Sequence, residues 1–241
     1  MQYFIKEAGN TMIQTMDKFK KENNINNKVC YCGRLDPMAR GLVLLLVGEE
    51  CKNMDKYLGC NKEYEFEIIF GLSTDTDDPM GFIGMPIIYD EKEIEFYCDK
   101  IKEFIIPHKF KQKFHNYSSK TINGNPMWQC TQNNIIIDIP SHEVEIYNVE
   151  YKPIKIYDFN EWKENIINTI NKIDKKNNFR QEQIIYIYNN ISLSKVYALP
   201  IKIKVSSGFY IRQLVADIKN HFNISILTYD INRISIHICN K

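Results

Sequence analysis

Apolar residues recur at helical spacing in three parts of the chain. A polar pair at Asn10-Thr11 is a typical helix N-cap, and the apolar series after it predicts a helix over residues 11–22. A longer series with the same spacing runs from Phe159 to Ile173. A third follows the turn Ser206–Gly208, where Ile211–Ile218 would turn its apolar side inward.

Other segments have the pattern of strands. Leu42–Val47 is a continuous apolar run with the length of a buried strand. In Tyr64–Phe70 aromatic and aliphatic residues alternate with glutamates, which predicts a strand with one buried and one wet face. Three further strands are expected at Ile135–Ile139, Val144–Val149 and Ile201–Val205.

The order of these elements predicts the fold class. Strands and helices interleave and hairpin-like neighbours are frequent, so we expect an α+β fold with a mixed, mostly antiparallel central sheet flanked by helices. Ser73–Gly81 has the composition of a turn-rich acidic loop, and Phe114–Trp128 that of a long polar, aromatic and basic loop. No internal repeat or linker divides the chain, which predicts a single domain over residues 1–241.

Composition narrows the function classes. Hydrophobic residues make up 44% of the chain, which suits an ordinary core, and no run approaches the roughly 20 apolar residues that span a bilayer. The N-terminus shows no secretory signal, so we expect an intracellular protein without a membrane segment. With 31 basic and 30 acidic residues the net charge is +1, so a nucleic-acid ligand would require basic side chains gathered on one face.

The cysteines form an odd set of seven without a repeated spacing. Cys30 and Cys32 are two positions apart, and neither CxxC nor HxxxH pairs, the usual marks of a zinc site, occur. Reduced cysteines in an intracellular protein are the simpler interpretation. A thiol or metal enzyme built on Cys30 and Cys32 is the alternative.

The segment Gly33–Gly41, which reads GRLDPMARG, contains the strongest candidate for a catalytic residue. The proline after Asp36 biases the aspartate backbone to extended geometry and so holds its carboxylate in one direction. The flanking glycines allow another chain to come close. Such a carboxylate could serve as nucleophile, general base or metal ligand, whereas an Asx turn before proline is the structural alternative.

The longer segment Gly33–Glu49 resembles the catalytic motif of the TruB family of RNA pseudouridine synthases, G-x-L-D-P-x-A-x-G-x-L before an apolar strand that ends in Gly-Glu. Four more segments are similar to family motifs and follow in the family's order. They are Lys62–Tyr64 (K-x-Y), Gly71–Asp78 (G-x-x-T-D-T-x-D), Tyr117–Gly124 (Y-S-A-K-K-x-N-G) and Ser207–Arg212 (K-G-T-Y-I-R).

The resemblance implies an enzyme that detaches uracil from its ribose, rotates it and rejoins it through carbon 5, with no cofactor or metal. Asp36 would be the nucleophile, and Arg212 would pair with it through a planar two-pronged contact. Tyr64 would stack on the target base and assist loss of the carbon-5 proton, and Tyr210 would help wall the pocket. Taken alone, the patterns favour a core tyrosine at Tyr64 and are compatible with a surface salt bridge at Arg212.

The resemblance also implies that the substrate is RNA, most directly uridine 55 in the T loop of tRNA. The uridine must leave its stack to be reached. In the family, the region equivalent to Phe114–Trp128 helps to grip the RNA, which makes Tyr117 and Lys120 candidates; a solvated loop is the alternative. Further candidates for phosphate contacts are Lys6, Arg34, Arg40 and Lys52.

Several departures from the family pattern stand out. Tyr31 occupies a position where many members have histidine, and the segment that begins at Lys6 lacks the family's proline. Residues of about 151–198 are longer than the family's connector, and we expect the C-terminal RNA-binding (PUA) domain to be absent. The helix of this region could partly replace that domain through Lys172, Lys175, Lys176 and Arg180, whereas a solvated helix end is the simpler interpretation. A monomer is expected. An RNA-binding chaperone or assembly protein with little turnover is the alternative function.

Overall fold

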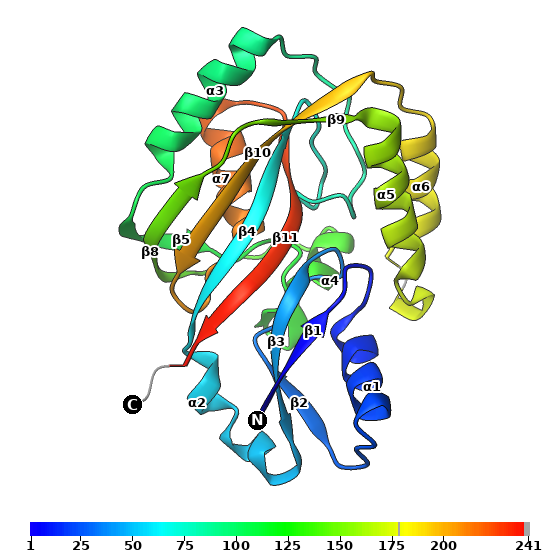
Figure 1. Cartoon of the computed structure of the whole chain (residues 1–241), viewed down its shortest axis with the longest axis vertical. Helices are drawn as coiled ribbons and strands as arrows, with labels where there is room; N and C mark the ends of the chain where they lie inside the picture. The colour runs from blue at the N-terminus through cyan, green and yellow to red at the C-terminus, as the bar shows by residue number, and fades with distance from the viewer. Residues whose placement is uncertain (178, 239–241) are drawn as a thin grey trace.

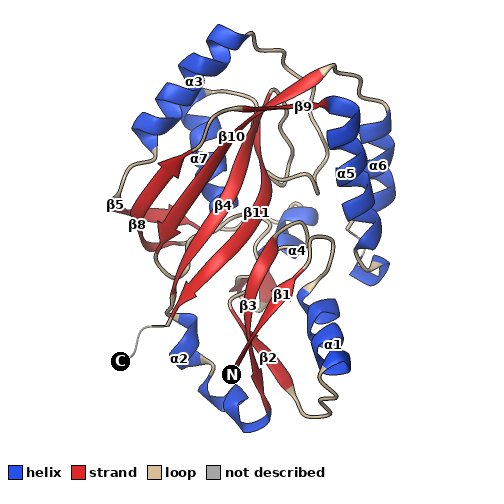
Figure 2. Cartoon of the chain, viewed as in Figure 1, coloured by secondary structure: helices blue, strands red, loops and turns tan. Residues whose placement is uncertain are grey.

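The computed structural model describes residues 1–177 and 179–238, which build one large sheet with helices on both of its faces (Figures 1 and 2). The strands are β1 Gln2–Lys6, β2 Val29–Cys32, β3 Arg40–Val47, β4 Asn61–Phe70, β5 His108–Lys113, β6 Thr121–Ile122, β7 Asn125–Pro126, β8 Ser141–Tyr151, β9 Lys155–Asp158, β10 Lys195–Val205 and β11 Ile226–His237. The α-helices are α1 Met12–Glu22, α2 Asp55–Leu58, α3 Glu91–Phe104, α4 Met127–Gln132, α5 Phe159–Lys172, α6 Gln181–Asn189 and α7 Ile211–Phe222, with 3₁₀ turns at Gly48–Asn53 and Lys175–Asn177.

The sheet has nine strands in the order β1-β3-β11-β4-β10-β8-β5, with β2 paired to β3 and β9 to β10. Every pairing in it is antiparallel except that of β11 with β3. The predicted α+β class with a mixed, mostly antiparallel sheet is confirmed. The parallel pair matters for the site because it joins the strand after Asp36 to the centre of the sheet.

Helices cover the sheet on both sides, which corrects one expectation. Phe66, Ile68 and the neighbouring strands pack against α3 and α7, whereas Ile69 on the opposite face packs against α5 and α6. The face of β4 that the sequence predicted to be solvent-exposed is therefore buried in the second half of the strand. Glu67 is buried there, where its carboxylate accepts from Tyr157 Oη at 2.9 Å and pairs with Lys155 at 2.7 Å.

A smaller lobe made of β1, β2, β3, α1 and α2 lies at one end of the molecule, near both termini (Figure 1). The predicted first helix is confirmed, and its N-cap is Thr11, which forms a capping box with Gln14. The predicted strand at Leu42–Val47 forms most of β3, in which Val43–Leu46 are fully buried. The loop between β2 and β3 carries Asp36 toward the main sheet.

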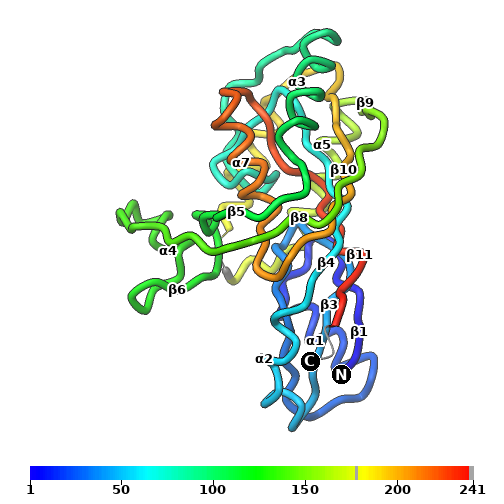
Figure 3. The backbone as a smooth tube through the Cα atoms, turned by 90° about the vertical axis from the view of Figure 1, so that its left-hand side faces the viewer, coloured from blue at the N-terminus to red at the C-terminus, as the bar shows by residue number. Residues whose placement is uncertain are grey.

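The stretch from Phe114 to Pro140 forms an arm that stands out from the body (Figure 3). It carries the small β6–β7 hairpin and α4, where a loop was expected up to Trp128. The strand predicted at Ile135–Ile139 is wrong: Ile136 is 99% exposed and the backbone has no strand partner. These residues follow α4 on the arm, and the β5–β8 ladder begins only after them, at Ser141.

Two wider properties of the described residues follow. None of their helices has the length and apolar content needed to cross a membrane. The six cysteines among them are all free thiols, in line with the reduced state expected from the sequence. Cys239 lies outside the described residues.

Candidate active site

Asp36 lies in the turn between β2 and β3. Its backbone carbonyl accepts from the Ala39 N–H at 3.1 Å, so the residues after it close a tight turn. Gly41 follows with φ +111°, and a Cβ at this position would lie 2.4 Å from the Arg233 carbonyl oxygen. Only glycine fits where β3 meets β11, which explains the second glycine of the motif in physical terms.

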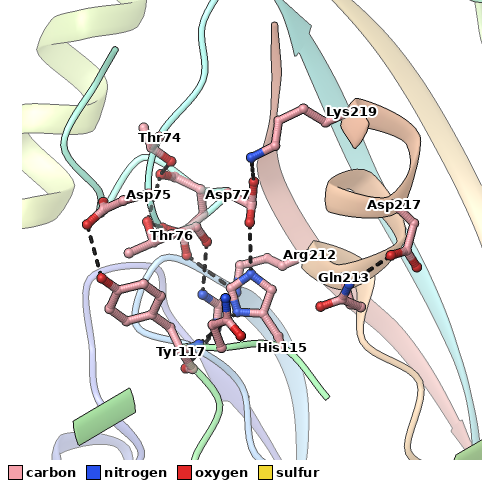
Figure 4. A network of polar contacts seen from close by, with 12 residues as sticks. Thr74, Asp75, Thr76, Asp77, His115, Tyr117, Arg212, Gln213, Asp217 and Lys219 are labelled. Carbon is pink, nitrogen blue, oxygen red and sulfur yellow. Dashed lines mark hydrogen bonds and ion pairs between the residues drawn. The ribbon is translucent and has the colours of Figure 1, made fainter. Parts of the chain in front are cut away.

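Arg212 comes from the first turn of α7 and is buried, with a side chain only 6% exposed. Its Nε donates to Asp36 Oδ2 at 2.8 Å, across 176 positions of sequence. Nη1 donates to the Thr76 carbonyl at 3.1 Å and Nη2 to the Tyr117 carbonyl at 3.4 Å (Figure 4). The pair expected from the sequence is present, but the two-pronged geometry is wrong, because the other donors hold two loops instead.

A second carboxylate shares this guanidinium. Asp78 Oδ2 lies 3.6 Å from Arg212 Nε, and Asp78 Oδ1 accepts from Thr76 Oγ1 at 2.8 Å and from the Met80 N–H at 2.9 Å. Burial raises the pKa of Asp78 to about 6. Burial also opposes the charge of Arg212, but Asp36 and Asp78 raise its pKa overall, so it stays protonated.

These groups open onto a pocket of about 230 Å³. Its walls come from the Asp36 turn, the start of α1, the acidic loop, the arm and the tip between α5 and α6. Four of the residues singled out from the sequence line it: Asp36, Arg212, Arg34 and Tyr117. The structure thus gathers segments distant in sequence around one ion pair.

Two of the expected pocket residues lie behind this wall. Tyr64 is buried in the main core on β4 and is not among the residues that line the pocket. Tyr210 precedes α7, packs edge-on against Phe114 at 5.7 Å between ring centroids, and does not line the pocket either. Burial raises the pKa of Tyr210, followed by the effect of the Asp36 charge.

Lys6 does not face solvent, where an RNA phosphate could reach it. Its side chain is fully buried, and Nζ donates to the carbonyls of Glu7 and Pro37 at 3.1 Å and of Ala39 at 2.5 Å. Burial lowers the pKa of Lys6 to about 7. A phosphate contact is therefore the wrong prediction for this lysine, which supports the turn that carries Asp36.

The remaining basic candidates are spread widely. Arg40 forms a two-pronged pair with Asp230, at 2.7 and 2.8 Å, and does not line the pocket. Lys52 is exposed on the 3₁₀ turn Gly48–Asn53, pairs with Glu49 and does not line the pocket. Lys120 is exposed on the arm, with Nζ 5.1 Å from the centroid of the Phe114 ring.

His115 and Asp77 form a polar cluster beside the site (Figure 4). His115 Nε2 lies 3.2 Å from Asp77 Oδ2, Lys219 pairs with Asp77 Oδ1, and the Tyr117 N–H donates to His115 Nδ1 at 3.2 Å. Burial lowers the pKa of His115, although Asp77 opposes this effect. His115 is thus an internal support for the arm and not an exposed RNA contact.

Thiol and metal chemistry find little support. Burial raises the pKa of Cys30 to about 12 and that of Cys32 to about 11, so neither thiol ionises readily near neutral pH. Among residues 1–177 and 179–238, no three His, Cys, Asp or Glu side chains gather as a metal site would require. Tyr31, the departure from the family histidine, lines the pocket and accepts from Arg34 Nη2 at 2.6 Å.

Sequence reasoning did not place two charged residues in the pocket. Asp78 lay inside the segment matched to the family's acidic loop, but nothing in its local pattern predicted contact with Arg212. Arg180 was expected only as one of several basic residues that could partly replace the domain expected to be absent, and it lines the pocket from the tip between α5 and α6. No local sequence signal marks it as a pocket residue.

Comparisons with known proteins give a family match. The sequence profile described as "TruB family pseudouridylate synthase (N terminal domain)" matches residues 20–163. A tRNA pseudouridine synthase B from Acholeplasma laidlawii is 32% identical over 149 residues, which cover 61% of this chain and 51% of that protein. Another, from Borrelia garinii subsp. bavariensis, is 26% identical over 231 residues, covering 96% and 67%.

The fold has a known counterpart as well. A chain in the crystal structure of a Cbf5-Nop10-Gar1 complex matches with a TM-score of 0.52 at 14% identity, covering 96% of this chain and 47% of that one. At this level of identity the likeness shows the fold alone. The chain spans about half the length of the first curated relatives that it matches.

Proposed function

The chain belongs to the TruB family of pseudouridylate synthases, and from this premise we propose that it isomerises uridine to pseudouridine in RNA, at uridine 55 in the T loop of tRNA. The observation that carries the proposal is the Asp36 carboxylate, one-third exposed at the wall of a pocket and held by a buried arginine. The names of the relatives, tRNA pseudouridine synthase B, support tRNA as the substrate.

In this reaction the bond from ribose C1′ to uracil N1 breaks and a bond from C1′ to C5 forms. The C5 proton is lost and N1 regains one, so the product is an isomer and no oxidant or co-substrate is consumed. We assign the nucleophile to Asp36, because its carboxylate has access to the pocket. Arg212 holds this carboxylate in place, because its buried guanidinium remains charged and donates to Asp36 Oδ2.

The pocket suits one extruded base and not a folded stem. Flipping a nucleotide out of its stack costs a few kcal/mol, which stacking and phosphate contacts must offset. Tyr117 and Trp128 supply aromatic wall and Arg34 supplies positive charge at the pocket. We assign base contacts to Tyr64 and Tyr210 from the family resemblance alone, since neither side chain lines the pocket. Tyr64→Phe keeps the ring and removes the hydroxyl, so it should reduce tritium release if that hydroxyl assists loss of the C5 proton.

The functional unit that we propose is one chain. All the pocket walls come from a single copy, so a monomer suffices, and an enzyme of tRNA would act inside the cell. Within the proposed single catalytic domain, residues of about 151–198 form α5, α6 and flanking strand segments, which we assign to a family-atypical insertion.

The test uses a tRNA transcript labelled with tritium at uridine C5, since each turnover releases that tritium to water. Wild-type protein should release one equivalent per tRNA, and chemical mapping should find pseudouridine at position 55. The Asp36→Asn variant should release none. If wild-type protein binds the transcript but releases no tritium, the alternative of an RNA-binding protein with little turnover replaces the proposal.

A further inference from the structure

The helical hairpin of α5 and α6 is part of the pocket's structural support and not a solvated appendage. Trp162, Ile166 and Ile170 of α5, with Ile184 and Tyr188 of α6, are buried against one face of the sheet. Figure 1 shows the two helices side by side, with their connecting tip pointing toward the small lobe. This packing fixes where the tip can reach.

The hairpin is tied to the site at two places. At the tip, Gln14 of α1 donates from Nε2 to the Lys172 carbonyl at 3.2 Å and accepts from the Asp174 N–H at 3.4 Å. Near the far end of α6, Tyr188 Oη donates to the Pro79 carbonyl of the acidic loop at 3.2 Å. The hairpin that carries Arg180 is thus anchored to the small lobe through its tip and to the loop of Asp78 through the end of α6.

Arg180 ends this tip and reaches into the pocket wall. Its Nη1 donates to Asp75 Oδ2 at 2.7 Å, and its guanidinium lies 4.2 Å from the centroid of the Phe82 ring and 5.6 Å from that of Tyr117. The same Asp75 oxygen accepts from Tyr117 Oη at 3.0 Å (Figure 4). One guanidinium therefore joins the hairpin, the acidic loop and the arm.

The backbone of Arg180 supports a specific role. It is left-handed, at φ 60° and ψ 25°, and its side chain makes no capping hydrogen bond to α6. A residue with a Cβ pays about 1 kcal/mol or more for this conformation, which glycine would avoid. The ion pair and the stacking contacts of the arginine side chain give a physical reason for a residue other than glycine here.

Charge at the pocket gives the contact a consequence for RNA. Among the described residues, Arg34, Arg180 and Arg212 line the pocket, as do Asp36 and Asp78, while Asp75 lies at its edge bound to Arg180. Three positive charges thus meet three carboxylates. Without Arg180, the Asp75 carboxylate would have no paired cation at the edge of the pocket. Its negative charge would then repel the phosphates of an RNA strand that enters there.

We propose that Arg180 is a substrate-positioning residue that acts through Asp75: it neutralises this carboxylate and fixes Tyr117, so that the pocket accepts the RNA strand around the target uridine. The inference rests on the proposed function, because it assumes that RNA occupies the pocket. The hairpin would in this way contribute to RNA affinity without touching the reacting atoms.

The test measures affinity for the tRNA transcript and the single-turnover rate at saturating RNA. Arg180→Ala should weaken affinity about five- to tenfold at low salt and less at high salt, with the saturated rate within about twofold of wild type. Arg180→Lys, which keeps the charge, should stay within about threefold in affinity. Lys100→Ala, which removes one exposed cation on α3, is the matched control and should leave both quantities unchanged.

The double variant Asp75→Asn/Arg180→Ala decides the route. If Arg180 acts by neutralising Asp75, removing the carboxylate as well restores most of the lost affinity; no recovery would mean direct contact with RNA and would overturn the inference. Equal affinities of Arg180→Ala and Lys100→Ala would overturn it too. Inactive wild-type protein would instead refute the proposed function, and urea midpoints identify any variant that is merely unfolded.

Discussion

Two arginine–aspartate pairs in this molecule differ in a way that reverses the usual expectation. Arg40 and Asp230 form the two-pronged contact that is regarded as the stronger geometry, yet their side chains are 43% and 37% exposed and lie outside the pocket. Arg212 meets Asp36 through one nitrogen only, but it is buried, and its other nitrogens bind the carbonyls of Thr76 and Tyr117.

The difference teaches what a buried guanidinium does at a site. An exposed ion pair typically contributes about 1 kcal/mol or less to stability, because solvent screens it. In the pair with Asp36 the guanidinium of Arg212 is buried and each donor is used by a different segment, so one side chain fixes the carboxylate, the acidic loop and the arm together. The functional arginine is therefore distinguished by the pocket segments that it holds together and not by the geometry of its ion pair.

The largest expected effect separates the two aspartates. Asp36→Asn keeps the shape of the side chain but removes the nucleophilic charge, so turnover should fall by about 10³-fold or more. Asp230→Asn loses only an exposed ion pair and should keep turnover within about twofold. Tritium release under single-turnover conditions measures both. Comparable losses in the two variants would remove the distinction between the pairs.

The next effect separates the two arginines. Arg212→Lys retains a charge but cannot reach Asp36, Thr76 and Tyr117 at once, so we expect a loss of about 10²-fold in turnover and a lower urea midpoint. Arg40→Lys should change turnover by less than about threefold. An active Arg212→Lys variant would show that charge alone, without the fork of donors, organises the pocket.

A third variant concerns the second carboxylate on Arg212. Asp78→Asn should reduce turnover by about tenfold, because Arg212 loses one of its two charged partners. Stability gives a sharper signature. The native pKa of Asp78 is raised from 3.8 to about 6, so between these values the folded chain binds a proton that the unfolded chain has released.

The sign of this pH effect is definite. The contribution of Asp78 to the free energy of unfolding falls as pH rises from about 4 to 6. Above pH 6 the cost of burying its ionised carboxylate is fully present. The unfolding free energy of wild type relative to Asp78→Asn should therefore decrease over this window by an amount on the order of 2 kcal/mol. Urea unfolding of both proteins at several pH values measures it, and a constant difference would contradict the raised pKa.

The comparison also shows how far the sequence alone reaches. Segments with strong periodicity, such as those of α1 and α5, were predicted correctly because burial of one face decides their structure. Ile135–Ile139 has a strand-like composition but lies on the arm, where tertiary context offers no partner strand. Conversely, the β-branched and aromatic residues of α6 do not favour a helix, and packing of Ile184 and Tyr188 against the core stabilises it there.

The α3 segment shows a signal that could have been found. Asp90 and Glu93 form a capping box, and Ile94, Cys98 and Ile101 follow at helical spacing. The site is different in kind: Arg212 and Asp36 are 176 positions apart, and only the family resemblance linked them. Arg180 was singled out only as a basic residue of the atypical region, and its place in the pocket could not be predicted, because it depends on how the hairpin packs.

The smallest expected change in turnover concerns Lys6, the buried cation beneath the Asp36 turn. Lys6→Met keeps the length of the side chain but leaves the carbonyls of Glu7, Pro37 and Ala39 without their donor, so we expect a loss of about three- to tenfold. Lys52→Met, at an exposed position, is the matched control and should have no measurable effect.

The pH dependence of stability in the Lys6→Met variant tests whether Lys6 is buried, in this case above pH 7. Burial lowers the pKa of Lys6 from 10.5 to about 7, so between these values the unfolded chain holds a proton that the native chain has released. The cost of burying the charged form is complete below pH 7 and is lost as pH rises toward 10. Wild type should therefore gain stability relative to Lys6→Met between pH 7 and 10 in urea unfolding. Because an exposed lysine has no such burial cost, Lys52→Met should show no pH-dependent difference, and a flat response in both variants would mean that Lys6 is hydrated.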